Sequence, residues 1–394
     1  MRNKIFWRWL SVFVVGMYVP GAWAQTPAPE MQLYQVTLLT PLGTNGIESS
    51  RFINRLSLNI IGGYNGGVAG LEVGGFFNAT RFSVHGGQFA GFANIVQDTV
   101  QGIQAAGFVN ITGAFTQGVQ TAGFANITAG RVRALQAAGF ANLIAGDLIG
   151  IQASGFINVA DGNIDGAQAS GFANIAQGVD GFQGAGFLNI ADGNLHGVQA
   201  AGFLNVARKV KGVQLSVINV CDTIDGVPIG LLNIVKKGYR RLEFWSTEAL
   251  HANMAFKMGA NRFYNLIAVG TQIPSLSTDP EHFYWGWGYG IGSDLRITRG
   301  LHVTIDLTAY HLNRGGRVTF ETNELNQLRT SFSFMLGQRT ALFLGPSLNV
   351  FISELQNSET NEFGPDFAPW TQWDHNDRYL GVKAWAGFQT GIRF

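Results

Sequence analysis

Histidine, cysteine and acidic side chains are the residues of this chain that could hold a metal or activate a nucleophile. The seven histidines form neither an H-E-x-x-H motif nor a Cys/His zinc pattern. His302 and His311 share a strand-like segment but lie nine residues apart, which puts them on opposite faces of a strand. The single cysteine, Cys221, excludes an intramolecular disulfide and a cysteine-cluster site, and we interpret it as a small buried residue. We predict no metal site.

Two further motifs are weaker than they first look. Asp161, Asn163 and Asp165 have the first three spacings of a calcium loop, but the bidentate Glu that such a loop needs is missing, so the segment is typical of a turn. Between Gly286 and Gly292, every second residue is Gly and the residues between them are Trp287, Tyr289 and Ile291, a pattern that predicts a strand. A G-x-S-x-G motif is also missing, so a serine esterase gains no support. We predict no catalytic residue, no cofactor and no enzyme activity.

The composition narrows the class of protein. Of 394 residues, 53 are Gly and only 13 % are charged, and the formal net charge is +1. Such a chain lacks the basic field that nucleic-acid binding requires, and it lacks the high net charge of a disordered segment. We therefore predict an ordered protein that does not bind nucleic acid.

The first 24 residues have the order of a secretory signal. Arg2 and Lys4 precede an apolar stretch that runs to Pro20, and Ala22-Trp23-Ala24 precedes Gln25. This pattern predicts cleavage after Ala24, and an uncleaved membrane anchor is the alternative. After Gln25 no stretch of about 20 apolar residues follows, so we predict no further transmembrane helix.

The middle of the chain is one tandem repeat of about 16 residues with the pattern G-x-Q-x-A-G-F-x-N-I. Its recurring side chains are Gln88, Gln104, Gln120, Gln136, Gln152, Gln168, Gln183 and Gln199; Phe92, Phe108, Phe124, Phe140, Phe156, Phe172, Phe187 and Phe203; and Asn94, Asn110, Asn126, Asn142, Asn158, Asn174, Asn189 and Asn205. A period held over so many copies indicates a repeat architecture.

Because Gln, Ala, Phe and Asn share one parity, each copy has strand spacing. Turn signals such as Asp161-Gly162-Asn163 interrupt each copy, so coils can stack as a β-solenoid. In such a stack we expect Phe above Phe to build a continuous core, and Asn and Gln ladders to satisfy their amides with the coils above and below. The alternative is one wide β-barrel in which each repeat spans a membrane, but Asn65–Gly238 contains no Trp or Tyr for aromatic girdles.

The C-terminal third differs in kind. It consists of alternating segments with abundant aromatics and ends in Phe394, which resembles the closing strand of bacterial outer-membrane β-barrels. Long and short connections alternate back from the end. Taking Leu242–Met258 as one descending strand, we expect an ascending strand at about Phe52–Tyr64, eight barrel strands, and the repeat array as an extracellular loop. Leu33–Leu39 is left as a periplasmic or plugging strand, or as a further barrel strand.

The repeats together with Leu58–Asn78, Lys237–Glu243 and Gly345–Phe351 resemble bacterial surface repeat-containing outer-membrane proteins. The resemblance implies a location in the outer membrane and transfers no catalytic residue.

We therefore expect an all-β protein in which a β-solenoid-like repeat array is combined with a small antiparallel outer-membrane β-barrel. The expected parts are 1–24, a signal peptide; 25–64, an N-terminal segment with the first barrel strand; 65–238, the repeat array; and 239–394, the barrel strands. The predicted function is a surface structural or adhesive role, and its expected partners are outer-membrane lipid and an extracellular macromolecule or neighbouring surface protein. A pore or uptake protein and an outer-membrane enzyme are the alternatives.

Overall fold

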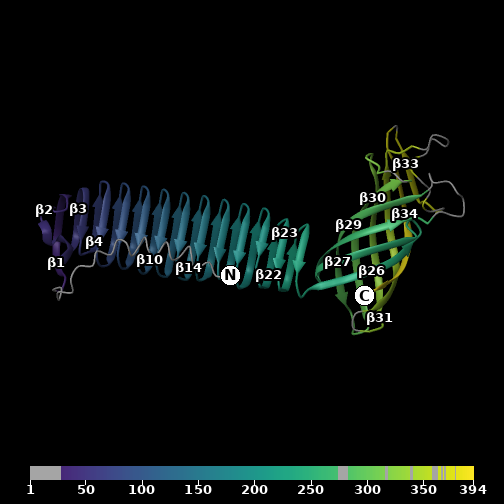
Figure 1. The fold of residues 1–394 in the computed structure, drawn as a ribbon, viewed down its shortest axis with the longest axis horizontal. Helices are drawn as coiled ribbons and strands as arrows, with labels where there is room; N and C mark the ends of the chain where they lie inside the picture. The colour runs from purple at the N-terminus through teal and green to yellow at the C-terminus, as the bar shows by residue number, and fades with distance from the viewer. Residues whose placement is uncertain are drawn as a thin grey trace. The chain divides into compact units, whose positions relative to one another are not determined.

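The computed structural model describes residues 28–273, 283–315, 318–337, 340–356, 363–364, 367, 370–377 and 379–394. The predicted signal peptide lies outside the described residues. The chain divides into two compact units, Met1–Val217 and Ile218–Phe394, drawn in Figure 1. Across the described residues, the fold is all-β and combines a parallel β-solenoid of about 11 turns with a closed eight-stranded antiparallel β-barrel, as the sequence predicts.

In the first unit each full coil consists of a longer strand and a four-residue strand, joined by a bend at Gly-Phe (Figure 1). Coils pair in parallel and in register, so that Gln104 lies beside Gln120 and Asn110 beside Asn126. Equivalent residues of successive copies are therefore neighbours, and this parallel pairing overturns the alternative of one wide antiparallel barrel built from the repeats. The glycine that precedes Gln in the pattern bends the strand; Gly102 has φ 136°, a conformation that side chains with a Cβ rarely adopt.

The strands of this unit are β1 (Glu30–Leu39), β2 (Leu42–Gly43), β3 (Phe52–Asn65), β4 (Gly67–Gly74), β5 (Phe77–Thr80), β6 (Val84–Ala90), β7 (Ala93–Val96), β8 (Val100–Ala106), β9 (Val109–Thr112), β10 (Thr116–Ala122), β11 (Ala125–Thr128), β12 (Val132–Ala138), β13 (Ala141–Ile144), β14 (Leu148–Ser154), β15 (Ile157–Ala160), β16 (Asn163–Ser170), β17 (Ala173–Ala176), β18 (Gly178–Ala185), β19 (Leu188–Ala191), β20 (Asn194–Ala201), β21 (Leu204–Val206) and β22 (Lys209–Leu215). A 3-10 helix, η1, spans Gly46–Arg51.

The expected first barrel strand is wrong. Phe52–Asn65 forms β3, which pairs in parallel with β1, β4 and β5 inside the solenoid. Leu33–Leu39 belongs to β1 and is also solenoid, so it is neither a plug nor a barrel strand. Barrel strands and solenoid strands share the same alternation of side chains. The alternation in these two segments therefore could not show to which fold they belong.

The second unit opens with β23 (Ile218–Cys221), β24 (Thr223–Ile229) and β25 (Leu232–Val235) and continues into the barrel. The barrel strands are β26 (Tyr239–Thr247), β27 (Ala252–Ala260), β28 (Phe263–Thr271), β29 (Tyr284–Arg296), β30 (Leu301–Arg314), β31 (Asn323–Met335), β32 (Ala341–Ser353) and β34 (Gly381–Arg393), and β33 (Trp373–Asn376) forms a hairpin with β34. Each barrel strand is antiparallel to its neighbours, and pairing of β26 with β34 closes the ring.

The barrel has eight strands, as expected from the sequence, but these are not the eight segments that the sequence led us to expect. The segment Leu242–Met258 contains two strands, β26 and β27, joined by a short turn after Thr247. The additional strand replaces Phe52–Tyr64 in the count of eight. The parity that led us to expect an extracellular array is therefore wrong, because an even number of barrel strands follows the array rather than an odd one.

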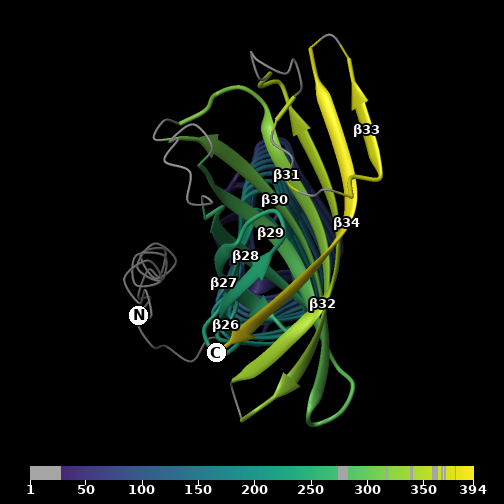
Figure 2. The same cartoon turned by 90° about the vertical axis from the view of Figure 1, so that its right-hand side faces the viewer.

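The two ends of the barrel differ in the lengths of their connections. The connections from β27 to β28, from β29 to β30 and from β31 to β32 are two to five residues long and lie at the end where β26 begins and β34 finishes. The opposite end carries the short β26–β27 turn at 248–251 and three longer connections, which join β28 to β29, β30 to β31, and β32 to β34 by way of β33. Figure 2 shows β33 and the C-terminus at opposite ends of the barrel.

Side chains of the barrel alternate between an apolar exterior and a polar interior. Phe256, Ile267 and Leu307 are exposed on the outside, whereas Lys257 and Asp306 next to them in the sequence are buried inside. Such inverted patterning is typical of a barrel surrounded by lipid. Among the described residues no helix is long and apolar enough to cross a membrane.

Candidate functional site

The interior of the solenoid is built from two ladders of amides. From Gln104 to Gln214, each Gln donates from Nε2 to Oε1 of the Gln one coil earlier, over 2.6–3.1 Å. From Asn78 to Asn189, each ladder Asn donates from Nδ2 to Oδ1 of the Asn one coil later, over 2.8–3.1 Å. All of these Gln and Asn side chains are fully buried. The sixteen predicted Gln and Asn side chains thus lie together in two continuous rows.

The Asn side chains are satisfied at every atom. Besides the ladder bond, Nδ2 of Asn94 donates to the backbone carbonyl of Ala105 at 2.8 Å, and Nδ2 of Asn142 donates to that of Ala153 at 2.7 Å. Because a backbone carbonyl can only accept, this second bond determines which amide atom is nitrogen. The Asn ladder therefore donates toward the C-terminus, whereas the Gln ladder donates toward the N-terminus.

Glu72 terminates the donor end of the Gln ladder. Its Oε2 accepts from Gln88 Nε2 at 2.8 Å and from Thr80 Oγ1 at 3.4 Å, and its Oε1 accepts from Asn59 Nδ2 at 2.9 Å and from Asn65. The carboxyl group is fully buried. Burial raises the pKa of Glu72 to about 7, although hydrogen bonds from Gln88 and the other donors act in the opposite direction. At the other end of this ladder, Gln214 Oε1 has no partner among the described residues.

The phenylalanines are placed differently from our prediction. The rings stack face to face, with centroids 4.7–5.2 Å apart from Phe76 to Phe203. Yet the eight predicted rings are 38–41 % exposed, so the ladder lies on the outside and a continuous Phe core is wrong. The Gly-Phe bend interrupts the strand between Gln and Asn, which both point inward, so the parity that these two share does not hold for the Phe at the bend.

Aliphatic side chains supply the core in place of Phe. Val132, Leu148 and Ile164 form one buried row, and Ile144 and Ala160 belong to another. Cys221, in the second unit, is also buried and pairs with Val235, as expected of a small buried residue. Burial raises the pKa of its thiol to about 12, with a contribution from Asp222.

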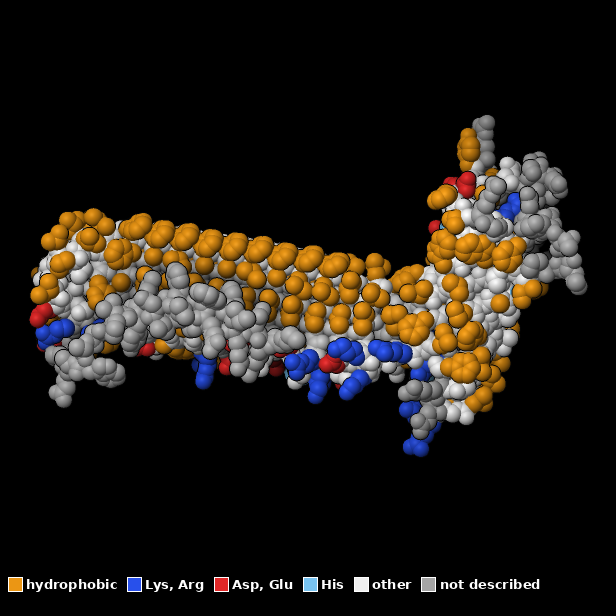
Figure 3. All heavy atoms as spheres, viewed as in Figure 1, with side chains coloured by type: hydrophobic (Ala, Val, Ile, Leu, Met, Phe, Trp, Pro, Cys, Tyr) orange, Lys and Arg blue, Asp and Glu red, His pale blue; other side chains and the backbone are white. Residues whose placement is uncertain are grey.

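One side of the solenoid is an apolar surface, which we call the apolar face. Its first row is the stacked phenylalanines from Phe76 to Phe203, and its second consists of exposed residues seven positions before each Asn. The members of the second row are Leu71, Ile103, Val119, Leu135, Ile151, Phe182 and Val198. Figure 3 shows hydrophobic side chains in rows along the repeats, with Lys, Arg, Asp and Glu gathered along one edge.

A shallow groove of about 700 Å³ runs between the two rows of the apolar face. Its lining residues lie between the row positions in each copy and are Ala106, Thr121, Ala122, Gly123, Ala137, Ala138, Gly139, Ala153, Ser154, Ala169, Ser170, Gly184 and Ala185. The glycines are required by close stacking: a Cβ on Gly139 would lie 2.1 Å from the carbonyl oxygen of Gly123. The groove is thus a consequence of the same small residues that let the coils stack.

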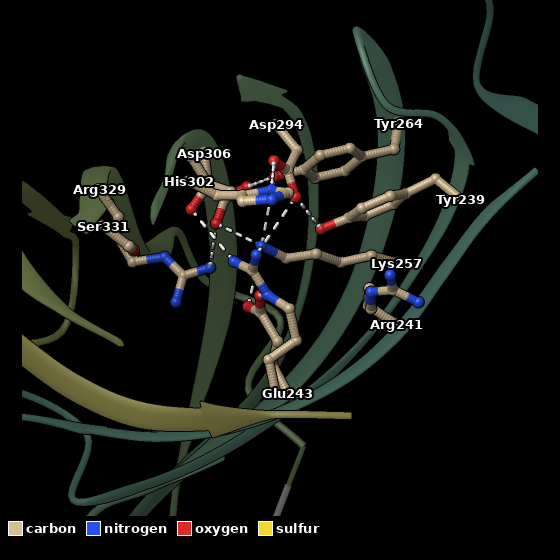
Figure 4. A network of polar contacts seen from close by, with 12 residues as sticks. Tyr239, Arg241, Glu243, Lys257, Tyr264, Asp294, His302, Asp306, Arg329 and Ser331 are labelled. Atoms are coloured by element: carbon tan, nitrogen blue, oxygen red, sulfur yellow. Dashed lines mark hydrogen bonds and ion pairs between the residues drawn. The ribbon is translucent and has the colours of Figure 1, made fainter. Parts of the chain in front are cut away.

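The barrel contains a buried ionic cluster (Figure 4). Lys257 Nζ lies 2.8 Å from Glu243 Oε2 and 2.7 Å from Asp306 Oδ2, and Arg329 lies 3.0 Å from the same Asp306 oxygen. Arg393 bonds Glu243 through Nε. These five side chains are at most 2 % exposed.

Tyrosines and a second acidic group complete the cluster. Asp294 accepts from Tyr239 at 2.9 Å, lies 3.3 Å from Arg393, and lies 2.8 Å from His302 Nδ1. Tyr264 donates to Asp306 at 2.7 Å. Lys257, Arg329 and Arg393 thus balance Glu243, Asp294 and Asp306 in number.

Side chains fill the lumen of the barrel, and the charged ones among them are paired with one another. Gly292 and Gly288 of β29 make room for it, since a Cβ on them would meet Tyr264 and Tyr310 at 2.5 and 2.9 Å. His311 points to the opposite face from His302 and contacts the backbone oxygen of Thr319 at 2.8 Å, as the nine-residue spacing predicts. Among the described residues no group of three His, Cys, Asp or Glu side chains is arranged to hold a metal.

Within the second unit, two further Asn side chains connect a coil to the barrel wall. Asn219 donates to Asn233 at 2.8 Å, and Asn233 donates to Asn265 Oδ1 of β28 at 2.6 Å. Asn265 in turn bonds the hydroxyl of Tyr289, which donates to the carbonyl of Leu231 at 2.9 Å. The coil β23–β25 is therefore attached to the outside of β28 and β29.

Sequence reasoning missed Glu72, the ionic cluster and the Asn265–Tyr289 link. The signal for Glu72 was present, because it occupies the Gln position of the first, imperfect copy. The cluster was harder to find: Glu243, Lys257 and Asp306 come from three strands, and only the inward parity of charges on otherwise apolar strands indicates them. Comparison with protein-family profiles, with curated proteins and with solved structures finds no match to this chain.

Proposed function

We propose that this chain is an outer-membrane protein whose barrel is the anchor and whose solenoid is a structural or adhesive interaction surface. The observation that carries the proposal is the apolar face, a continuous exposed surface much larger than a soluble protein ordinarily leaves uncovered. The resemblance to surface repeat-containing outer-membrane proteins agrees with this function.

The barrel's inverted patterning supports the membrane anchor. Exposed Phe244, Phe256, Leu307 and Phe332 lie on its outside, and the paired charges fill its inside. Apolar side chains on the outer surface of a barrel are stable in contact with lipid. In water the same apolar band would be exposed to solvent, which is unfavourable.

The connection lengths support a periplasmic solenoid. Barrels of the outer membrane have short periplasmic turns and long extracellular loops. Three of the four short turns lie at the end where β26 begins, and all three long connections lie at the other end. The solenoid precedes β26 in the chain. We therefore propose that the partner is met in the periplasm, and not outside the cell as the miscounted strand parity predicted.

A pore gains no support from the lumen. An eight-stranded barrel is just wide enough to be filled by side chains, and Glu243, Lys257, Asp306, Arg329 and Arg393 are almost completely buried there. An enzyme gains no support either, because the paired charges of the cluster are engaged with one another and shielded from substrate.

The sidedness is tested by cysteine labelling of the full chain in cells, in a Cys221→Ala background. Phe320→Cys probes the long-loop end, Asn261→Cys a short turn, and Asp161→Cys an exposed solenoid turn. A membrane-impermeant maleimide should label Phe320→Cys on intact cells, and the other two only after the outer membrane is permeabilised.

Two results would contradict the proposal in different ways. Labelling of Asp161→Cys on intact cells would return the solenoid to the cell surface. Recovery of the chain in a soluble fraction, with all three positions labelled alike, would overturn the barrel anchor itself.

A further inference from the structure

We propose that the apolar face is covered by a second copy of this chain, in a parallel dimer whose two-fold axis runs along the solenoids. The inference rests on the proposed function, because it names the partner of that interaction surface. Each Phe row would pack into the groove of the other copy.

The size of the apolar face fits a stable dimer. Nine stacked Phe rings and seven residues of the second row are each about two-fifths exposed. With 150–250 Å² for a full aromatic side chain, these residues expose roughly 1,000 Å² of apolar surface. A standard protein interface buries about 800 Å² on each partner. The face is therefore large enough to hold two copies together.

The shape of the face is complementary to itself. A ridge of Phe rings lies beside a groove of Ala, Gly, Ser and Thr, and both follow the repeat with the same spacing. A two-fold axis along the solenoid sets the ridge of each copy opposite the groove of the other. A two-fold axis across the face would set ridge against ridge, which leaves both grooves empty. Identical coils then meet at every level, as an isologous interface requires.

The parallel arrangement also agrees with membrane anchoring. Two copies related in this way have their C-terminal units at the same end, so both barrels can enter one membrane. An antiparallel dimer would direct the two C-terminal units in opposite directions. The membrane thus selects the same arrangement as the shape of the face.

Sugars, nucleic-acid bases, lipid surfaces and acyl chains fit the apolar face less well than a second copy of this chain does. Sugars and bases bind aromatic side chains through the ring face, but these ring faces are stacked on one another at 4.7–5.2 Å. An anionic lipid surface favours a basic rim, whereas the row beside the face contains both signs, with Arg133 and Lys211 as well as Asp165 and Asp180. A single acyl chain in so shallow a groove would stay largely in water.

The first experiment tests the register by cross-linking in isolated outer membranes, with the full chain in a Cys221→Ala background. Thr121→Cys, Ala137→Cys, Ala153→Cys and Ala169→Cys each place one thiol in the groove, one coil apart. In a parallel dimer every one of the four variants cross-links to its own copy. An antiparallel dimer permits self-linking near one level only. Asp161→Cys, on a charged turn, is the control that should stay uncross-linked.

The second experiment measures mass in detergent solution. Leu135→Glu places a charge on the second row and should raise the dimer dissociation constant at least about tenfold. Arg133→Glu, two residues away on the same strand and outside the face, should leave it unchanged. Circular dichroism of both variants verifies that the coils are still folded.

The outcomes separate the dimer from the proposed function. A monomeric chain whose groove cysteines link to a different protein in cells would overturn the dimer and retain the interaction surface. A monomeric chain without any cross-link in cells would overturn both. Self-linking confined to one of the four positions would overturn the parallel arrangement.

Discussion

At the residue scale, the solenoid solves the problem of a polar interior by repetition. A buried amide costs free energy unless its donors and acceptors are all bonded. Stacking identical amides one strand spacing apart gives every Asn the same partners, including the backbone carbonyl that fixes its orientation. The two ladders donate in opposite directions, so their aligned dipoles oppose one another. Glu72 then provides oxygen acceptors where the Gln donors end.

Glu72 should make the stability of the solenoid depend on pH. Its pKa is about 7 in the folded chain and about 4.3 when unfolded, so the folded state binds more protons between these values. The contribution of Glu72 to stability is therefore fully present below about pH 4 and falls by roughly 3–4 kcal/mol as the pH rises through about 7. Urea unfolding of the full chain, followed by circular dichroism at pH 4.5, 6 and 8, measures the slope. Glu72→Gln should flatten it, and an unchanged slope in that variant would assign the effect to another group.

Asn142 should contribute more to stability than the larger Phe156. Asn142→Ala removes three hydrogen bonds from a buried row: those to Ala153 O and Asn158 Oδ1, and the one that Asn126 Nδ2 donates beside its bond to Ala137 O, at a cost of about 3 kcal/mol or more. Phe156→Ala removes a stacked ring that is 40 % exposed, which should cost about 1–2 kcal/mol. Denaturant midpoints of the two variants decide the order, and the reverse order would mean that the exterior stack holds the coils together.

At the element scale, the repeat period predicted the coils and their stacking because each recurring residue type has one place in the coil. The prediction failed at bends and turns that the residues around them do not indicate. The Gly-Phe bend turned Phe outward. The β26–β27 hairpin was missed because its turn after Thr247 lacks Gly, Pro, Asn and Asp. Instead, Thr247 Oγ1 accepts from Leu250 N at 3.0 Å, and Asn253 donates to Leu250 O at 2.7 Å. The barrel's strand number was predictable, but the inward charges depend on pairing between strands distant in sequence.

Removal of one full coil should be tolerated. Deleting residues 125–140 joins Phe124 to Ala141 and brings Gln120 beside Gln152 and Asn110 beside Asn142, so every ladder stays in register. Deleting residues 125–132, half a coil, would shift Asn142 to a glycine bend position and interrupt both ladders. We expect the circular dichroism spectrum and urea midpoint of the first variant to resemble the parent and those of the second to show lost structure. Equal damage by both deletions would contradict the in-register stack.

At the scale of the whole molecule, the barrel contains its own stabilising interactions. The ionic cluster is drawn entirely from β26 to β34, and the coil β23–β25 that contacts β28 belongs to the same compact unit. The Gln ladder likewise lies within Met1–Val217, from Glu72 to Gln214, and so do the Asn bonds from Asn78 to Asn205. Each unit therefore has a complete core, and each should fold on its own.

Removal of residues 28–217 should leave a barrel that still inserts and folds. The variant keeps the Asn219–Asn233–Asn265 chain and all six charges of the cluster, so the barrel loses none of its buried partners. Folding is measured by the shift in electrophoretic mobility between unheated and boiled samples, which should match that of the parent barrel after correction for mass.

Lys257→Met in the full chain keeps the solenoid and weakens the barrel instead. The substitution leaves Glu243 and Asp306 without their shared cation, at a cost of about 3–5 kcal/mol. When samples are heated stepwise before electrophoresis, the Lys257→Met variant should lose the mobility shift at a lower temperature than the parent does. If the truncated barrel instead fails to insert while Lys257→Met is unaffected, the solenoid, and not the ionic cluster, is what the barrel needs to fold.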